Sequence, residues 1–417
     1  MEEKNIKRQN IYKVIMLIIL AITITFITTT IVMYNKFQNV YQLGYISKSN
    51  SESSESTSLI KTLETFKAVL QQKYIGEIDD DKLMEGAIKG YIEGLGDPYT
   101  EYLTKEEMAE FTEEVSSEYV GIGVYVTNNI TDNTILVAGV MKQSPALEAG
   151  MEAGDVITKI DGVSYTGEQL DDATKILKGE EGTTAKVTVL RDGKEIELTV
   201  TRKKITIEHV ASEMLNNNIG YIEIDSFDSG VASAFKEQIT ALKNDGAKGI
   251  IIDLRSNGGG IVDEATEIAD LFLKKDETIL ITKSKNEEEV VTKSKKDPII
   301  TEIPVVILVN ESTASASEIL AGALKENYGA TIVGKNTYGK GIIQTLYKLS
   351  DGSVLKITTD EYYTPKHDKI NKIGIAPDVE VDLTIDENGY YETSMDKDAQ
   401  LLKAIEILSK GTEVSDN

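Results

Sequence analysis

The stretch that decides the fold reads Pro304-Val-Val-Ile-Leu-Val309, then Asn310-Glu-Ser-Thr-Ala-Ser315, then Ala316-Ser-Glu-Ile-Leu-Ala-Gly-Ala-Leu324. Its first part is a continuous apolar run, which is typical of a strand buried on both faces. Its last part carries apolar residues at helical spacing. A strand, a polar loop and a helix in this order indicate an α/β domain. Because sites in such domains lie beyond the carboxyl ends of strands, chemistry is expected after Val309.

A second stretch repeats the pattern from Gly249 onward. The apolar run Gly249-Ile-Ile-Ile-Asp253 is followed by Leu254-Arg-Ser-Asn-Gly-Gly-Gly260. Three glycines directly after a strand permit backbone conformations that are closed to other residues, and consecutive free N–H groups form an anion-binding nest. An ordinary turn from strand to helix would explain the same glycines, so both interpretations stay open at this point.

Ser315 is the candidate nucleophile of the first loop. It lies between small residues at the expected helix start, where free N–H groups stabilise an oxyanion. A helix N-cap is the alternative, although one cap explains only one of the four hydroxyl residues Ser312, Thr313, Ser315 and Ser317.

Lys340 is a better candidate base than either histidine. It lies in Tyr338-Gly-Lys-Gly-Ile-Ile-Gln344, where glycines and isoleucines favour a dry environment that lowers a lysine pKa toward the range of a general base. His209 falls in an alternating, strand-like run and His367 in a charged turn. A Ser/His/Asp triad with His367 and Asp253 is the alternative.

The segment Gly334-Lys-Asn-Thr-Tyr-Gly-Lys340 has the GxxxxGK part of the phosphate-binding loop motif. The next residue is Gly341, where such a loop needs Ser or Thr to hold magnesium. The sequence therefore argues against an ATPase.

Residues 118–204 have a different pattern, with short β-rich runs separated by Gly-containing turns, and the first strand is expected over Gly121–Val126. Together with Ser144-Pro-Ala146 and Gly154-Asp-Val-Ile157, the segment Gly121-Ile122-Gly123-Val124 resembles a PDZ domain of bacterial envelope proteases. The resemblance implies that this glycine-containing loop binds a peptide's terminal carboxylate through backbone N–H groups. An unrelated small β module is the alternative.

The residues before this module favour helices. Leu59, Leu63, Phe66 and Leu70 form one apolar stripe at helical spacing, and a second helix is expected over Asp81–Glu93. The stripe indicates either packing within its own domain or the contact of a homodimer.

Val14–Tyr34 runs without a charge for long enough to span a bilayer as a helix. The 13 preceding residues carry four basic side chains against two acidic ones, which places them in the cytoplasm and the bulk of the chain outside. A cleaved signal peptide is the alternative, but Thr28-Thr-Thr30 offers no small-residue cleavage site. The sequence thus predicts a single-pass protein of the cell membrane with an extracytoplasmic catalytic portion.

The composition excludes several functional classes. The 417 residues contain no Cys and two His, which argues against disulfide scaffolds, cysteine enzymes and multi-histidine metal sites. The net charge of −25 argues against nucleic acid as a partner. No metal and no cofactor are expected.

Several motifs together resemble the carboxyl-terminal processing, or tail-specific, serine peptidases. They are, in chain order, Gly94-Leu-Gly-Asp-Pro-Tyr99, the PDZ-like module, Asp253-Leu-Arg-Ser-Asn-Gly-Gly259, Thr313-Ala-Ser-Ala-Ser-Glu-Ile319, Gly339-Lys-Gly-Ile-Ile-Gln344, Tyr363-Thr-Pro365 and Gly374-Ile-Ala-Pro-Asp378.

The resemblance implies roles for individual residues. It implies Ser315 as nucleophile, Lys340 as base and Gln344 as the residue that orients the lysine. It also implies oxyanion donors from the backbone of Ala316 and of Gly258 or Gly259. Lys366-His-Asp368 stands where a smaller or glycine-containing turn is expected, so the local loop departs from the pattern.

The sequence therefore predicts a multidomain α/β protein. Its expected parts are a cytoplasmic tail (1–13), a transmembrane helix (14–34), a Ser-rich tether (35–58), a helical region (59–117), a PDZ domain (118–204), an α/β serine-lysine peptidase core (205–395) and a helical carboxyl-terminal tail (396–417). The expected function is a membrane-anchored serine endopeptidase that cleaves proteins with exposed apolar carboxyl termini. A catalytically silent PDZ adaptor that binds envelope protein tails is the alternative.

Overall fold

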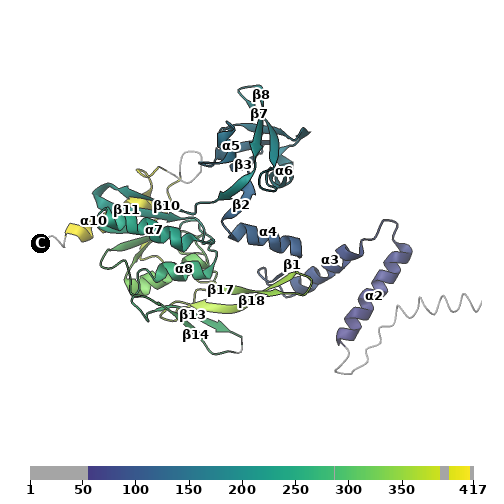
Figure 1. Ribbon diagram of the computed structural model, residues 1–417. Helices are drawn as coiled ribbons and strands as arrows, with labels where there is room; N and C mark the ends of the chain where they lie inside the picture. The colour runs from purple at the N-terminus through teal and green to yellow at the C-terminus, as the bar shows by residue number, and fades with distance from the viewer. Residues whose placement is uncertain (1–54, 286, 386–393, 414–417) are drawn as a thin grey trace, which may run out of the picture. The chain divides into compact units, whose positions relative to one another are not determined.

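The computed structural model describes residues 55–285, 287–385 and 394–413 (Figure 1). The chain separates into two compact units, residues 1–87 and 88–417. The predicted transmembrane segment and cytoplasmic tail lie outside the described residues, as does most of the predicted tether. None of the described helices is both long and apolar enough to cross a bilayer.

The first unit contains helix α2 (Glu55–Lys73) and the first part of α3 (Asp80–Glu93). α2 begins at Glu55, so the last four residues of the predicted tether are helical. Lys67 pairs with Asp80 at 2.8 Å. The predicted apolar stripe of α2 is exposed along its whole length. Contact of this stripe with a second chain stays a prediction.

The second unit contains the remaining helices. They are α4 (Lys105–Val115), α5 (Pro145–Glu148), α6 (Leu170–Leu177), α7 (Val231–Asn244), α8 (Val262–Ala269), α9 (Ala316–Ala323) and α10 (Ala399–Glu413), with a π-helical turn at Leu324–Tyr328 after α9.

A six-stranded sheet forms the centre of the α/β region. Its strands, in spatial order, are β10 (Val210–Leu215), β11 (Ile219–Ile224), β12 (Gly249–Asp253), β15 (Val305–Val309), β16 (Thr331–Gly334) and β19 (Val379–Glu380). β10 is antiparallel to β11, and the other pairs are parallel. The carboxyl ends of β12 and β15 are therefore neighbours at one edge of the sheet.

Both faces of this sheet are covered, which explains the continuous apolar runs of its strands. Ile250 and Ile307 pack in one core with residues of α7, α8 and α9. Ile251 and Val306, which point to the opposite face, pack with Leu401 and other residues of α10. The predicted doubly buried strands are confirmed.

A second, antiparallel sheet carries the segment that follows Lys340. It consists of β1 (Glu101–Leu103), β18 (Val354–Tyr363), β13 (Thr278–Ser284) and β14 (Val290–Lys293), and β17 (Ile342–Lys348) pairs with β18. The β17–β18 register shifts between Ile343 and Gln344.

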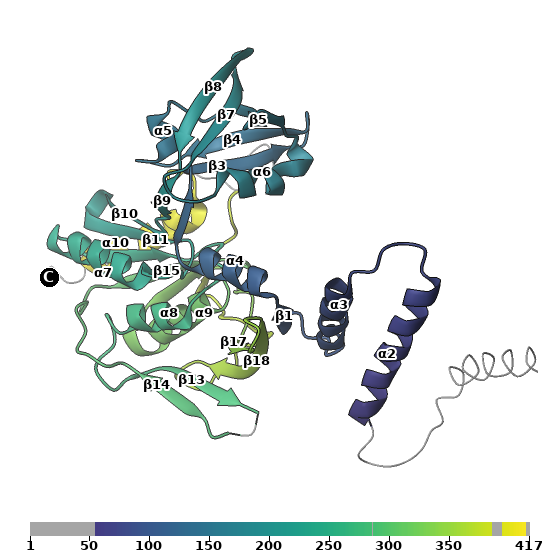
Figure 2. The same cartoon turned by 45° about the vertical axis from the view of Figure 1, so that its right-hand side comes forward.

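The PDZ module is a third sheet, visible around α6 in Figure 2. Its strands are β3 (Val124–Asn129), β4 (Thr134–Val140), β5 (Val156–Ile160), β6 (Val163–Ser164), β7 (Thr184–Arg191) and β8 (Lys194–Thr201). Where the chain enters and leaves the module, β2 (Glu118–Gly121) and β9 (Lys203–Thr206) pair in a separate antiparallel ladder.

The strand expected over Gly121–Val126 is interrupted. β2 ends at Gly121 and β3 begins at Val124, because Gly123 has a φ of 81°. A Cβ atom at Gly123 would lie 2.4 Å from Cβ of Ser144, so packing also requires glycine there.

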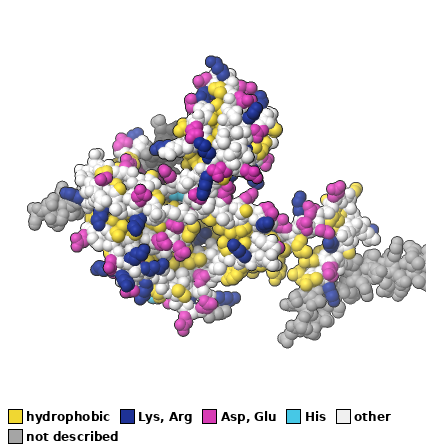
Figure 3. Space-filling view, viewed as in Figure 1, with side chains coloured by type: hydrophobic (Ala, Val, Ile, Leu, Met, Phe, Trp, Pro, Cys, Tyr) yellow, Lys and Arg dark blue, Asp and Glu magenta, His cyan; other side chains and the backbone are white. Residues whose placement is uncertain are grey.

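The surface carries charges of both signs. On the face drawn in Figure 3, Lys and Arg side chains lie interspersed with Asp and Glu rather than in one basic patch. Such a face lacks the clustered cations with which proteins neutralise phosphates.

Candidate active site

Ser315 lies at the start of α9, directly after the loop that follows β15. Its φ of 57° and ψ of −118° are rarely adopted by residues other than glycine. Ser315 is partly exposed, whereas its neighbours Ala314 and Ala316 are buried. A strained turn that presents a hydroxyl between a strand and a helix is typical of serine nucleophiles in hydrolytic enzymes.

Two other hydroxyl groups of the cluster have structural partners. Thr313 is buried and its Oγ1 donates to the carbonyl of Leu254 at 2.8 Å. Ser317 is also buried and its Oγ donates to the carbonyl of Asn257 at 3.1 Å. One bond starts from the loop after β15 and the other from the first turn of α9, and both end on the loop after β12. These residues therefore build the scaffold around Ser315.

The glycine loop after β12 packs directly against the candidate nucleophile. A Cβ atom at Gly259, where φ is 102°, would lie 2.6 Å from Cβ of Ser315 and 2.9 Å from N of Ala316. Only glycine permits this approach. The structure therefore brings together the loops that the sequence predicted for nucleophile and oxyanion donors.

Hydrogen bonding favours Gly258 over Gly259 as the oxyanion donor. The N–H of Gly259 donates to Oδ1 of Asn257 at 2.8 Å. The N–H groups of Gly258 and Ala316 have no acceptor within the described part of the chain. Unsatisfied N–H groups in the two loops that meet at a serine are suited to an oxyanion hole.

Glu318 joins the serine and lysine segments. Its fully buried carboxylate accepts hydrogen bonds from the N–H groups of Ser315 (2.9 Å), Gly339 (2.8 Å) and Lys340 (2.9 Å), and from Oγ1 of Thr337 (2.5 Å). Burial raises the pKa of Glu318 above its ordinary value, although these hydrogen bonds oppose the increase. One carboxylate thus fixes the backbones of both candidate catalytic residues.

Tyr362 makes a second connection. Its buried hydroxyl lies within hydrogen-bonding distance of the carbonyl oxygens of Ser315, at 3.0 Å, and Lys340. Burial raises the pKa of this hydroxyl, so it stays protonated.

The sequence analysis assigned no role to Glu318 or Tyr362. Ser315-Ala-Ser-Glu318 has the S-x-x-E pattern of a capping box, which could have identified the glutamate as a partner of the serine backbone. Tyr362 precedes the Tyr363-Thr-Pro365 motif, but nothing local in the sequence indicates its partners.

The Lys340 side chain is half-buried and has no hydrogen bond to Ser315 within the described residues. Its Nζ lies 4.5 Å from the centre of the Tyr99 ring. Burial, and secondly the charge of Lys356, hold the pKa of Lys340 below its ordinary value. The structure therefore brings the backbones of the predicted dyad together while the lysine side chain contacts an aromatic ring.

Gln344, predicted to orient the lysine, lies on β17. Its Nε2 donates to Oγ1 of Thr358 on β18 at 3.2 Å. The structure places Gln344 on the strand that follows Lys340, but its amide has a partner other than the lysine.

The alternative triad is not assembled. His367 is exposed, and its Nε2 lies 3.3 Å from Glu289. The Asp253 carboxylate accepts hydrogen bonds from Tyr221 and Arg255 instead. His367 also has a φ of 69°, which agrees with the glycine-containing turn expected at this position.

The second histidine is paired with two aspartates. His209 lies between Asp225, at 2.6 Å, and Asp228, at 3.2 Å. Its hydrogen bond to Asp225 raises the pKa of His209. Within the described residues, no group of three His, Cys, Asp or Glu side chains is arranged to hold a metal ion.

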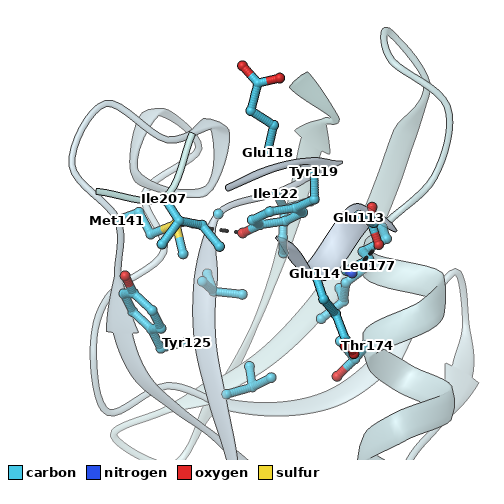
Figure 4. A pocket seen from close by; sticks show the side chains of 14 residues that line it. Glu113, Glu114, Glu118, Tyr119, Ile122, Tyr125, Met141, Thr174, Leu177 and Ile207 are labelled. Carbon is cyan, nitrogen blue, oxygen red and sulfur yellow. Dashed lines mark hydrogen bonds and ion pairs between the residues drawn. The ribbon is translucent and has the colours of Figure 1, made fainter. Parts of the chain in front are cut away.

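The predicted peptide-binding loop lines an apolar groove of about 340 Å³ in the PDZ module (Figure 4). Ile122, Gly123 and Val124 contribute to it, together with Leu177 at the end of α6. Gly121 lies just outside the lining, under the Tyr119 ring, whose Cε2 would be 2.8 Å from an added Cβ.

Acidic residues at the groove were not anticipated from the sequence. Glu113, Glu114 and Glu118 contribute to the lining, where Glu113 pairs with Lys178 at 2.5 Å and Glu118 pairs with Lys204 at 2.6 Å. These glutamates come from α4 and β2, outside the motif that predicted the groove.

Comparisons with known proteins match three regions of the chain. Residues 218–381 match peptidase family S41, residues 119–201 match a PDZ domain, and residues 18–107 match the activating protease CtpB N-terminal domain. The S41 region contains Ser315, Lys340 and Gln344. These matches favour a peptidase over a silent PDZ adaptor.

Whole-chain comparisons agree with these regions. The carboxy-terminal processing protease CtpA of Bacillus subtilis is 39% identical over 75% of this chain and 67% of its own length. The "Probable CtpA-like serine protease" of Staphylococcus haemolyticus is 37% identical over 81% of this chain and 68% of its own. The crystal structure of a "Putative S41 protease" from Bacteroides fragilis is 16% identical, with a TM-score of 0.51, over 82% of this chain and 96% of its own, which supports the fold alone. The chain belongs to peptidase family S41, among the carboxy-terminal processing proteases, and is a serine-type peptidase.

Proposed function

We propose that the protein is a membrane-anchored serine endopeptidase that cleaves extracytoplasmic proteins near their carboxyl termini, with a Ser315–Lys340 dyad and a PDZ domain that binds the substrate tail. The observation that carries the proposal is the shared carboxylate of Glu318. Because it accepts the N–H groups of both Ser315 and Lys340 at 2.9 Å, the two side chains start from adjacent backbone positions.

The proposed reaction begins with neutral Lys340, whose Nζ accepts the proton of the Ser315 hydroxyl. Oγ attacks the peptide carbonyl, and the N–H groups of Gly258 and Ala316 stabilise the oxyanion. The lysine then gives the proton to the amide nitrogen, and the C–N bond breaks to release the carboxyl-terminal fragment as an amine. Water, deprotonated by the same lysine, attacks the acyl-enzyme ester, the bond to Ser315 Oγ breaks, and the lysine returns the proton to Oγ.

This reaction requires the lysine side chain to move. Its Nζ lies on the Tyr99 ring and must turn toward Ser315 to accept the proton. In that arrangement the Gln344 amide would leave Thr358 and orient the lysine.

We assign the PDZ groove to substrate tails that end in apolar residues with a free carboxylate. Val124, Val126 and Leu177 give the groove an apolar lining, and the loop at Gly123 offers backbone N–H groups to the carboxylate. The glutamates around the groove disfavour tails with further acidic residues.

Amidation of the tail is expected to weaken binding. A peptide with an apolar carboxyl-terminal residue should lose affinity for the full-length Ser315→Ala protein at least about tenfold when its carboxylate becomes an amide, because charge-assisted hydrogen bonds are lost. Calorimetric titration of the two peptides measures the ratio.

The matched control changes one internal glutamate of the same peptide to glutamine. It alters the peptide charge equally but keeps the terminal carboxylate, so affinity should stay constant or increase. Equal affinity of the free-acid and amidated peptides would show that the loop does not bind the carboxylate.

The anchor rests on the apolar segment 14–34 and its basic flank. Protease added to intact cells is expected to release a fragment that contains the catalytic core and lacks the anchor. An antibody against the carboxyl terminus detects the fragment, and a cytoplasmic protein serves as the control for lysis. A core that stays intact while a known external protein is digested would reverse the topology.

A further inference from the structure

Tyr99 contacts the candidate base, although neither the sequence nor the proposed reaction gives it a role. It lies between α3 and β1, and the face of its ring is 4.5 Å from Nζ of Lys340. An aromatic face attracts an ammonium group through its quadrupole, and it attracts the neutral amine much less. The ring therefore favours the charged lysine, which cannot act as a base.

The turn that carries Tyr99 is held in place by hydrogen bonds. Asp97 Oδ1 accepts from the N–H of Tyr99 at 3.1 Å, and Asp97 Oδ2 accepts from the Thr100 hydroxyl at 2.6 Å. The same hydroxyl oxygen accepts from the N–H of Thr358 at 3.0 Å. These hydrogen bonds attach the turn that carries Tyr99 to β18. The position of the turn therefore does not depend on the position of the Lys340 side chain.

The same strand residue also holds the amide of Gln344. Gln344 Nε2 donates to Oγ1 of Thr358 at 3.2 Å, so the turn of Tyr99 and the side chain of Gln344 share one attachment point. The side chain of Tyr338, two residues before Lys340, is the main reason that the pKa of Tyr99 is raised.

We propose that Tyr99 is a positioning residue that holds Lys340 in a charged arrangement away from Ser315, from which the lysine must be released for catalysis. The inference rests on the proposed role of Lys340. Burial of the lysine and the nearby charge of Lys356 favour its neutral form, whereas the ring favours its charged form. The balance among these three effects decides how much neutral lysine is present at a given pH.

The test measures the pKa of Lys340 without using activity. In full-length protein that carries Ser315→Ala, lysines are labelled with acetic anhydride over a pH series, and mass spectrometry reads the peptide that contains Lys340. Tyr99→Leu keeps an apolar side chain but removes the aromatic face, so the Lys340 pKa is expected to fall by roughly half a pH unit.

Three further variants make the result specific. Tyr99→Phe keeps the face and removes the hydroxyl, so the Lys340 pKa should stay unchanged. Tyr91→Leu removes an exposed tyrosine of α3 and should also leave it unchanged. Tyr99→Met, which is apolar and flexible, should reproduce the leucine result and provides the measurement if Tyr99→Leu does not fold. An unchanged pKa in the leucine and methionine variants, or an equal fall in the phenylalanine variant, would overturn the inference.

Activity of enzyme with Ser315 intact separates this inference from the proposed dyad. The rising limb of kcat against pH should move to lower pH by the same amount in Tyr99→Leu, with KM for a short peptide changed less than about twofold, since the ring acts on the base and not on the substrate. If the Lys340 pKa falls but the rising limb of the kcat–pH profile does not move, the effect of Tyr99 on the lysine is supported. The same result would show that Lys340 is not the catalytic base.

Discussion

Replacement of Ser315 by alanine is expected to lower kcat/KM at least about a thousandfold, because loss of a nucleophile leaves only the stabilisation by the oxyanion hole and substrate binding. The fold should persist. The neighbouring residues Ala314 and Ala316 are buried independently of the hydroxyl, and the hydrogen bond from the Ser315 N–H to Glu318 involves the backbone. Cleavage of a tailed protein substrate, followed by mass spectrometry, measures the loss.

Ser317→Ala is the matched control. Its hydroxyl is buried and donates to the carbonyl of Asn257, so its removal should lower the free energy of unfolding by about 1 kcal/mol and retain most of the activity. Circular dichroism confirms folding of both variants. Wild-type activity in folded Ser315→Ala protein, after contamination is excluded, would show that another residue is the nucleophile.

Lys340→Arg is expected to lower kcat/KM about as much as Ser315→Ala does, since a guanidinium stays charged and cannot accept the serine proton. In the wild-type enzyme, activity should rise with pH as the ammonium of Lys340 loses its proton. Because burial and Lys356 lower the pKa of Lys340, this rise should occur below the pH at which a free lysine titrates. The pH dependence of kcat measures it.

Two lysines provide controls for this result. Lys348→Arg changes an exposed lysine of β17 and should leave the rate unchanged. Lys356→Gln removes the like charge that lowers the pKa of Lys340, so the rise should move to higher pH. An active Lys340→Arg enzyme, or a rise in activity that depends on His367, would move the role of base away from the lysine.

The buried strands were predictable because each one is an uninterrupted run of apolar residues in the sequence. Gly249–Asp253 is β12, with both ends as expected, and Val305–Val309 of the second run is β15. Alternate residues face two different cores, so every position must be apolar. The PDZ strand was predicted as continuous through Gly121–Val126 because the pattern of apolar residues does not reveal the positive φ of Gly123.

The connections within the candidate site were not predictable in the same way. Glu318 bonds to residues 337, 339 and 340, and Tyr362 bonds to carbonyl groups of two separate loops. Such partners are distant in sequence and meet only through the topology of two sheets. The choice between Gly258 and Gly259 likewise depends on the amide of Asn257, which occupies the N–H of Gly259.

The backbone conformation of Ser315 has a consequence for how this chain can change over evolutionary time. A non-glycine residue in this conformation costs roughly 1–3 kcal/mol, whereas glycine adopts it freely. Glycine at position 315 would therefore relieve strain and abolish the hydroxyl in a single step. A lineage released from the need to hydrolyse peptides would gain stability by that substitution, so the serine marks a position where selection for catalysis opposes selection for stability.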